Sequence, residues 1–505
     1  MKHYIIILLL LPFLLNGCNS FLDQVPDDRT ELTDVASVKA LLVSAYPDGH
    51  YLMAGELMSD NTDDKGSYMA SIMPEMQEQA YFWKESTQNI QDAPMHYWNR
   101  LYRAIASANH ALEAIRNNGG GAAYDPYLGE AKMVRAFNHF LLVNFWAKHY
   151  DPATAALDPG VPYVTKPEKE ALVDYKRNTV KEVYDLIEKD MTEALPLLTD
   201  NAYDVAKYHF TRAAANAFMA RFYLFRGEAE DWDKVIAHTS AILGTNFKSQ
   251  LRNYSGKYLP IASNVDAYSQ LYTNYGEAAI LMLTNASSFW YYTYRAGRYG
   301  LSEAKYTEIY NAAKVRDHGW IGTLYGSWPH YYTGKFYPYL QVAYPGAASG
   351  RPYVLCPILT VEEAVFNRAE AYVMKKEYNA AVNDLNIYLS TRTRGYQESL
   401  HAITADAVVA FYKENAAAIS LEPWYKDQLE EKQVCMLQYI TDLRRKEFVQ
   451  EGVRWFDVKR FRIEVTHRVF ESTQKDVLTK TDPRRVWQIP SMALEYGLEP
   501  NPGWN

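Results

Sequence analysis

The sequence contains little cysteine, with three residues in 505: Cys18, Cys356 and Cys435. No further cysteine or histidine stands at metal-ligand spacing around Cys356 or Cys435, which argues against a structural zinc site. A disulfide between these two residues is possible in an oxidising compartment, and two buried thiols are at least as good an interpretation. The sequence leaves both alternatives open.

Positive charge is also scarce. The 52 Lys and Arg residues face 60 Asp and Glu residues, which gives a net charge of -8. An acidic chain is a poor partner for nucleic acid or for anionic lipid, so this balance argues against both. No second apolar run long enough to cross a bilayer follows Cys18.

Motifs of catalysis and of cofactor binding are absent as well. The sequence has no HExxH zinc motif, no GxSxG nucleophile elbow and no glycine-rich phosphate loop. The acidic stretch from Asp60 to Asp64 fails as a calcium loop. With Gly66 at the sixth position of such a loop, Lys65 and Ile72 stand where oxygen ligands are needed. We therefore predict no enzymatic activity, no metal and no cofactor.

The N-terminus carries an apolar run from Tyr4 to Leu15, preceded by Lys2. The run is shorter than the roughly 20 residues that span a bilayer and is typical of a signal-peptide core. It ends in Leu15-Asn16-Gly17-Cys18, which resembles a bacterial lipobox, so we predict cleavage before Cys18 and lipidation of that residue. Several acyl chains would anchor the protein firmly. A plain secretory signal with a chance cysteine, or a core strand of a cytosolic protein, are the alternatives.

Helical periodicity dominates the chain after this N-terminal region. Apolar side chains recur at helical spacing from Met95 to Ile115, and the stop signal NNGGG follows. A second helix is predicted from about Tyr127 to Lys148, and a third begins at Thr179. Two capping boxes are predicted, Thr179 with Glu182 and Thr360 with Glu363.

Two segments, residues 211–243 and 360–389, resemble each other. Each predicts a helix with small residues, a short turn and a second helix that opens near an aromatic residue, Trp232 or Tyr378. Small alanine side chains let paired helices approach closely, which is typical of tetratricopeptide hairpins. Two unrelated antiparallel helix pairs are the alternative.

A long segment, residues 251–358, lacks this periodicity and is rich in Tyr, Trp, Gly, Asn, Ser and Pro. It predicts loops and short strands inserted into a helical scaffold. Beyond it, residues 437–464 predict one charged helix. We interpret its ionised residues as an ion-pair lattice that braces the scaffold rather than as a catalytic group; they are Glu447, Glu451, Arg454 and Asp457.

The predicted organisation is therefore a helical chain with one irregular insert. Its parts are a lipoprotein signal peptide (1–17), an acylated tether (18–34), a helical-hairpin scaffold with an N-terminal ligand loop (35–250), the aromatic-rich insert (251–358), and a last hairpin with a C-terminal region (359–505).

Several stretches in this order resemble the SusD/RagB family of surface lipoproteins from Bacteroidetes-type bacteria. They include CNSFLDQVP, YWNRLYRAIASANHAL, GEAKMVRAFNHFLLVNFWAKHY, TRAAANAFMARFYLF, VEEAVFNRAEAYV, LRRKEFVQEGVRWFDVKRF and IPSMALEYGLEPNPGWN. The resemblance implies a mainly α fold of about four tetratricopeptide-like hairpins with an irregular ligand-binding half. It also implies a lipid-anchored protein, exposed on the outer membrane, that captures an oligomeric nutrient, most often a glycan. Such a protein closes like a lid over a TonB-dependent, SusC-like transporter.

Aromatic residues supply the candidate binding groups. The sequence holds 42 Tyr and 11 Trp, more than a core needs. Sugars offer C–H faces that stack on flat rings and hydroxyls that pair with carboxylate, amide or guanidinium groups, and residues 59–83 and 287–332 supply both. We predict stacking by Trp83, Trp290, Tyr292, Trp320 and Trp328, and polar contacts by Asp64, Lys65, Arg295 and Arg298. Burial in the core is the alternative for every ring.

The leading hypothesis is a glycan-binding lipoprotein without catalytic activity. A peptide ligand on the same architecture is the first alternative, which the RagB side of the family implies. A surface glycoside hydrolase and a structural repeat adaptor are the alternatives from other classes.

Overall fold

The computed structural model describes most of the chain after the N-terminal region. The described residues are 32–66, 73–168, 173–311, 315–316, 319–327, 330–342, 344–345, 347, 349–415 and 418–504. Cys18, the signal peptide and most of the tether lie outside them, and so does Trp328.

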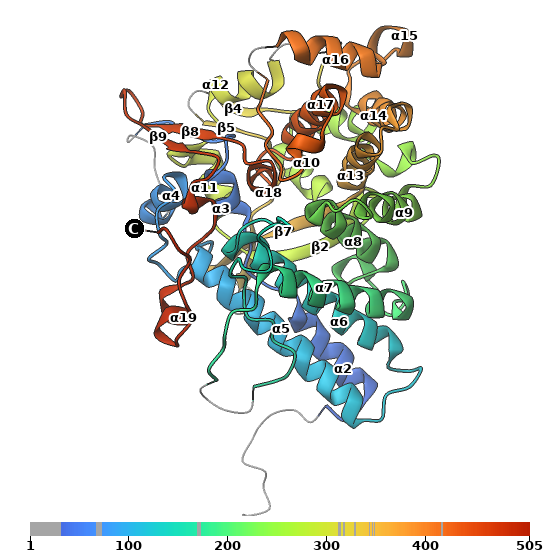
Figure 1. Cartoon of the computed structure of the whole chain (residues 1–505), viewed down its shortest axis with the longest axis vertical. Helices are drawn as coiled ribbons and strands as arrows, with labels where there is room; N and C mark the ends of the chain where they lie inside the picture. The colour runs from blue at the N-terminus through green and yellow to red at the C-terminus, as the bar shows by residue number, and fades with distance from the viewer. Residues whose placement is uncertain are drawn as a thin grey trace, which may run out of the picture.

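Helices that pack in successive pairs form the scaffold (Figure 1). Within the described residues the pairs are α5 with α6, α8 with α9, α13 with α14, and α16 with α17; α7 covers α6, and α9 packs on α13. The fold is thus mainly α with tetratricopeptide-like hairpins, as predicted. The bounds are α2 (Val35–Leu42), α5 (Pro94–Asn117), α6 (Asp125–Trp146), α7 (Val180–Ala194), α8 (Arg212–Arg226), α9 (Asp231–Leu243), α13 (Val361–Met374), α14 (Tyr378–Arg392), α16 (Ala405–Glu414) and α17 (Glu431–Glu447).

The helix boundaries follow the local signals. Helices α5 and α6 lie where the periodicity predicts them, and the two similar segments fold as α8–α9 and α13–α14. The capping box at Thr179 is complete, because Thr179 and Glu182 exchange both hydrogen bonds. The second box is only half formed. Thr360 accepts from the amide of Glu363, but the Glu363 carboxylate pairs instead with the buried Arg221, whose Nε lies 2.7 Å from Oε1.

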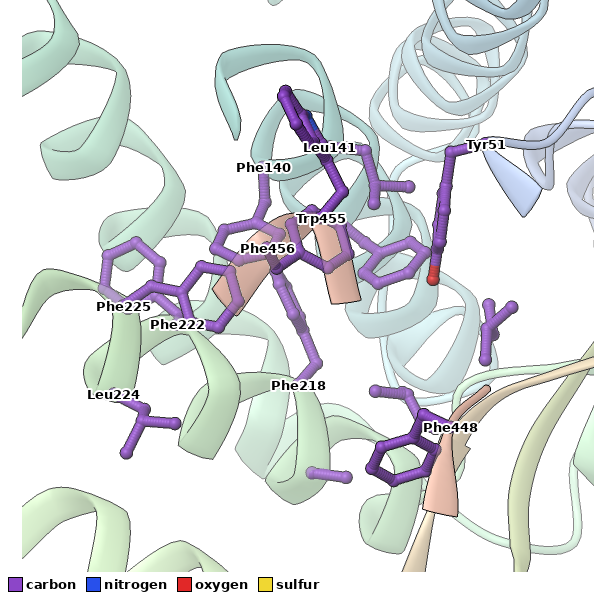
Figure 2. Packing of buried hydrophobic residues seen from close by; sticks show 14 of the residues in the cluster. Tyr51, Phe140, Leu141, Phe218, Phe222, Leu224, Phe225, Phe448, Trp455 and Phe456 are labelled. Carbon is purple, nitrogen blue, oxygen red and sulfur yellow. The ribbon is translucent and has the colours of Figure 1, made fainter. Parts of the chain in front are cut away.

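Aromatic side chains from early and late parts of the chain pack together in the core (Figure 2). Phe140 of α6 packs against Phe218 of α8, with ring centroids 5.4 Å apart. Phe225 of α8 meets Phe456 of the short helix α18 (Arg454–Arg460), with centroids 5.5 Å apart. The C-terminal region is therefore packed into the N-terminal half of the scaffold.

The predicted single helix over residues 437–464 is wrong. Helix α17 ends at Glu447 and α18 begins at Arg454, because Gln450 and Gly452 have left-handed backbones with φ of 67° and 68°. A Cβ on Gly452 would lie 2.8 Å from the carbonyl oxygen of Leu52, so the turn needs glycine there. The predicted ion-pair lattice is confirmed in kind, since Glu447 pairs with Arg392 and Arg454 pairs with Asp60.

Short sheets and short helices make up the insert and its surroundings. The main sheet has the order β2 (Ile280–Ser287), β7 (Gly350–Thr360), β6 (Tyr339–Val342) and is antiparallel. Strand β7 is eleven residues long, longer than the short strands predicted, and its last residue Thr360 is also the N-cap of α13. Strand and helix are therefore joined without a linker.

The remaining elements are short. The two-stranded sheets are β1 (Asp63–Asp64) with β3 (Tyr299–Gly300), β4 (Tyr325–Ser327) with β5 (His330–Tyr332), and β8 (Val465–Arg468) with β9 (Lys475–Leu478). The short α-helices are α3 (Leu52–Leu57), α4 (Pro74–Tyr81), α10 (Val265–Tyr272), α11 (Trp290–Ala296), α12 (Glu303–Tyr306), α15 (Glu398–His401) and α19 (Ser491–Glu495). The 3-10 and π turns are η3 (Val43–Ala45), η4 (Leu195–Leu197), η5 (Ala206–Tyr208), η6 (Lys248–Gln250), η7 (Tyr254–Tyr258), η8 (Leu259–Ile261), η9 (Thr307–Asn311), η10 (Lys426–Gln428) and η11 (Pro483–Arg485).

The two cysteines that the structure describes are free thiols. Cys356 lies in β7 and Cys435 in α17, and both are buried. The structure therefore selects the buried-thiol interpretation.

Candidate functional site

The two predicted ligand stretches meet in space. Strand β1 pairs with β3, so that Asp64 lies opposite Tyr299. The Asp64 carboxylate accepts two hydrogen bonds from the Arg298 guanidinium, of 2.7 and 2.8 Å, and further bonds from the amides of Gly66 and Phe470. Burial opposes ionisation of Asp64, but these donors outweigh it and hold its pKa below the ordinary value. Asp64 and Arg298 thus join the two stretches to each other.

Lys65 lies beside this ion pair and is buried. Its amide donates to the carbonyl oxygen of Arg298 at 2.9 Å, and its Nζ has no hydrogen-bond partner among the described residues. Burial lowers the pKa of Lys65 to about 8. The three residues predicted to make polar contacts, Asp64, Lys65 and Arg298, therefore lie together in the structure. Asp64 and Arg298, however, form an ion pair with each other.

Two of the predicted stacking residues, Trp83 and Trp290, lie in the core, and each is 0% exposed. The Trp290 Nε1 donates to the carbonyl oxygen of Gln450 at 2.9 Å. The Trp83 Nε1 donates to that of Met58, and its ring stacks on His467 with centroids 4.3 Å apart. Neither ring offers a face to solvent, so for these two the core interpretation holds in this conformation.

Helix α11 presents the accessible part of the site. Tyr292 is 37% exposed, and Arg295 is half-buried. The Arg295 guanidinium lies over the rings of Tyr291 and Tyr332, at 4.8 and 4.7 Å from their centroids. We call Tyr291, Tyr292, Arg295 and Tyr332 the α11 surface. It combines an exposed ring with a guanidinium held in place by two further rings.

The start of α11 is fixed by a buried carboxyl group. Asp92 accepts from the Ser288 hydroxyl at 2.5 Å and from the Phe289 amide at 2.7 Å. The Ser288 Oγ in turn accepts from the amide of Trp290. Burial raises the pKa of Asp92 to about 7. The direction of α11, and hence of Tyr292, depends on these bonds.

Trp320 lies half-buried beside a small cavity whose lining includes none of the four residues of the α11 surface. The cavity has a volume of about 30 Å³ and is lined by rings of Tyr254, Tyr268, Tyr306, Tyr310 and Trp320, with Thr333, Lys335 and Glu447 among the polar residues. One water needs about 10–15 Å³ on this measure. The cavity thus has room for about two waters and not for a sugar ring.

The turn between α17 and α18 supports the whole region, and the sequence reasoning missed it. Gln450 accepts from the Trp290 indole on its carbonyl and from the amide and hydroxyl of Thr333 on its Oε1, at 2.8 and 2.9 Å. Its amide donates to Glu56 at 2.7 Å, and the next residue, Glu451, pairs with Lys335 at 2.6 Å. One turn therefore holds α3, α11 and the segment after β5. Gly452 is the signal that could have indicated it.

The residues of the α11 surface can bind a ligand. Within the described ranges no group of three or more His, Cys, Asp or Glu side chains is placed to hold a metal ion. None of the helices that the structure describes is long and apolar enough to cross a membrane. The α11 surface offers a ring for stacking and a guanidinium for paired hydroxyl or carboxylate groups.

Two family models match the sequence. The model described as starch-binding associating with outer membrane, of the SusD-like type, matches residues 20–224. The model of the SusD family matches residues 361–499. No curated protein matches this chain.

Solved structures resemble the chain over almost its whole length. A SusD superfamily protein from Bacteroides thetaiotaomicron is 18% identical with a TM-score of 0.64, covering 94% of this chain and 100% of its own. A SusD-like carbohydrate binding protein from Bacteroides vulgatus is 15% identical with a TM-score of 0.59, covering 92% and 96%. A laminarin binding SusD-like protein is 16% identical with a TM-score of 0.57, covering 93% and 98%. At these identities the likeness shows a shared fold.

Proposed function

Since the chain belongs to the SusD/RagB family of carbohydrate-binding, outer-membrane-associated proteins, we propose that it captures a glycan at the cell surface and hands it to a TonB-dependent transporter. It binds its ligand without cleaving it. It is held to the membrane by acyl chains on Cys18, a residue that lies outside the described part of the chain.

The α11 surface is the observation that supports glycan binding. Tyr292 exposes a ring on which the C–H face of a sugar can stack, and Arg295 can donate two parallel hydrogen bonds to neighbouring hydroxyls. The guanidinium already lies over the rings of Tyr291 and Tyr332, so little side-chain entropy is lost when it binds. The laminarin binding relative shares the fold on which this surface is built.

Titration of the purified protein with a panel of polysaccharides tests this proposal. Covering a tyrosine face removes about 50 Å² of apolar surface from water, worth about 1 kcal/mol, so Tyr292→Ala should weaken binding about fivefold. Arg295→Ala should weaken it at least as much. Tyr496→Ala, which removes a ring that is 62% exposed beyond α19, is the matched control and should leave binding unchanged.

The ligand class follows from the same titrations. Binding to a neutral glycan should be insensitive to salt, and mass spectrometry should find no cleavage products. Salt-sensitive binding to peptides with no response to any glycan would instead select a peptide ligand. Binding to neither class would end the proposal.

The lipid anchor and the transporter are tested in cells. A fatty-acid label should be incorporated into the wild-type chain and not into Cys18→Ser. A barrel of the TonB-dependent class should co-purify with the wild type from outer membranes in mild detergent. Recovery of an unlabelled chain in the cytosol would contradict the anchor.

A further inference from the structure

A second cavity lies away from the insert, where α6 and α18 end beside the C-terminal segment. Its volume is about 510 Å³, within the range of about 300–1,000 Å³ that is typical of small-molecule sites. Flat or rigid rings of Trp424, His149, Pro159, Pro483 and Pro502 contribute to its wall. None of its residues belongs to the α11 surface, so this cavity is independent of the proposed function.

More cationic than anionic residues line this cavity. Three are anionic, namely Asp151, Asp158 and Asp482, and six are cationic, namely Lys148, Lys459, Arg460, Arg462, Lys480 and Arg485. The chain as a whole has a net charge of -8. The lining of the cavity therefore has an excess of positive charge, although the protein as a whole is negatively charged.

Four of these six cations are already neutralised by carboxylates. The pairs are Lys148 with Asp158 at 2.7 Å, Arg462 with Asp151 at 3.0 Å, Lys480 with Glu422 at 2.8 Å, and Arg460 with Glu370 and Asp457 at 2.5 and 2.9 Å. Asp482, the third carboxylate of the wall, is paired with Arg484 at 2.8 Å. Arg484 is shared with Asp476, also at 2.8 Å, but none of the lining carboxylates makes an ion pair with the two remaining cations in the described chain.

Those two cations, Lys459 and Arg485, are buried, with 5% and 7% of their surface exposed. Lys459 donates to the carbonyl oxygens of Asn144 and Ala147, and Arg485 donates to those of Thr479, Val458, Ile463 and Leu478. Neither makes an ion pair within the described chain. Burial, and then the charge of Arg485, lower the pKa of Lys459 to about 7, and burial lowers that of Arg485 to about 10.

Helix ends offset part of this charge. The accepting carbonyls of Asn144 and Ala147 belong to the C-terminus of α6, and that of Val458 to the C-terminus of α18. A helix C-terminus carries roughly half a unit of negative charge, so the two ends offset about one of the two buried charges. The positive charge that remains is shared between Arg485 and the protonated form of Lys459. Lys459 also has three N–H groups and uses two of them.

We propose that this cavity binds a ligand that carries one carboxylate and has the size of one or two sugar rings, such as a sugar acid. One carboxylate would compensate this remaining charge and favour the protonated form of Lys459. The carboxylate accepts hydrogen bonds from the unused N–H groups of Lys459 and Arg485. The rings of the wall cover the rest of the ligand.

Calorimetric titration of the purified protein with D-glucuronate and with D-glucose tests the charge. Glucuronate should bind and glucose should not. N-acetylalanine, a carboxylate without a sugar ring, shows whether the ring contributes; stronger binding of glucuronate identifies a sugar acid. Equal binding of glucuronate and glucose, or no binding of any carboxylate, would overturn the proposal.

Two lysines of the same cavity provide a matched pair of variants. Lys459→Met removes an unpaired cation and should weaken glucuronate binding at least tenfold. Lys480→Met removes a cation already neutralised by Glu422 and should change binding less than twofold. Equal losses in the two variants would refute the role of unpaired charge. Tyr292→Ala should leave glucuronate binding intact, which separates this site from the proposed function.

A measurement on the wild-type protein tests the role of Lys459 even if Lys459→Met does not fold. A bound anion favours the charged form of Lys459, so binding near pH 7 should take up a fraction of a proton. Titrations in two buffers of different ionisation enthalpy measure this uptake, and affinity should fall as the pH rises from 6 to 8.5. Binding without proton uptake and without pH dependence would contradict the assignment.

Discussion

Substitution of Arg392 by methionine is expected to reveal how strongly the buried ion network holds scaffold and insert together. Arg392 lies in α14, is 0% exposed, and donates to Glu447 of α17 at 2.8 and 2.9 Å and to Glu362 of α13 at 3.0 Å. Its guanidinium also lies 4.3 Å from the ring centroid of Tyr254 in the insert. One side chain therefore links its own helix α14 to α13, α17 and the insert.

The expected cost follows from what the substitution leaves behind. Methionine fills much of the volume, but Glu447 keeps its charge in the core without its main partner. Removing one partner of a buried ion pair costs about 3–5 kcal/mol, whereas replacing all partners by apolar groups can cost little. We expect Arg392→Met to lower the free energy of unfolding by about 3–5 kcal/mol. Adding Glu447→Leu to it should recover part of this loss.

The pH dependence provides a second signature. Burial alone would raise the pKa of Glu447, but Arg392 outweighs it, so the pKa falls from its ordinary 4.5 to about 2. A lowered carboxyl pKa stabilises the fold above about pH 4.5, and this contribution is lost as the pH falls towards 2. Without Arg392 the burial effect dominates, and protonation of Glu447 relieves the variant. The deficit of Arg392→Met should therefore shrink between pH 7 and pH 4.

Guanidinium unfolding followed by circular dichroism measures both effects. Arg394→Met, an exposed arginine two residues away, is the matched control and should stay within about 0.5 kcal/mol of the wild type. A loss below about 1 kcal/mol for Arg392→Met, or a deficit that grows on acidification, would refute the reasoning.

Three further predictions follow from buried groups. Trp290→Ala removes a fully buried ring and its hydrogen bond to Gln450, so it should lower the free energy of unfolding by about 3–5 kcal/mol and also weaken glycan binding. Tyr292→Ala should weaken binding but leave the thermal midpoint unchanged. Calorimetry and ligand titration together distinguish the two variants. Because burial raises the pKa of Asp92 to about 7 from an ordinary 3.8, the folded state keeps a proton that the unfolded state has lost, and stability should fall as the pH rises from about 4 to 7. Asp92→Asn should flatten that part of a profile of midpoint against pH, and an unchanged slope would contradict the assignment. In the absence of reductant, Cys356 and Cys435 should react with a thiol reagent only after the protein is denatured, because both thiols are buried. If they do not react in the denatured protein, a disulfide joins them.

The long helices could be predicted from the sequence because their signals are local. The apolar spacing from Met95 to Ile115 and the complete capping box at Thr179 need no knowledge of the rest of the chain. The half-formed box at Thr360 shows the limit of that reasoning. Its Glu363 is taken by Arg221, 142 positions away in the sequence, and no local pattern reports such a partner.

For a related reason, the break between α17 and α18 was not predicted from the sequence. Residues on both sides of the turn are buried, so apolar and charged positions continue at helical spacing through it. Only Gly452, which the close approach of Leu52 requires, indicates a turn. The pairing of β2 with β7 joins segments about 70 positions apart and likewise leaves no local trace.

The candidate site was predicted in part. The sequence indicated which stretches carry binding groups, and Asp64 and Arg298 lie together, yet they pair with each other. The side of α11 that faces the core is set by Gln450, 160 positions from Trp290. Trp290 and Tyr292 are equally plausible as platforms in the sequence, and the packing of one short helix decides between them.

The direct passage from β7 into α13 restricts how this protein can move. Thr360 is the last residue of the strand and the cap of the helix, and it is 3% exposed. A hinge needs a few residues whose backbone angles can change freely, and this junction has none. The sheet and the helical body should therefore rotate as one piece there, so that any hinge of this protein has to lie elsewhere in the chain.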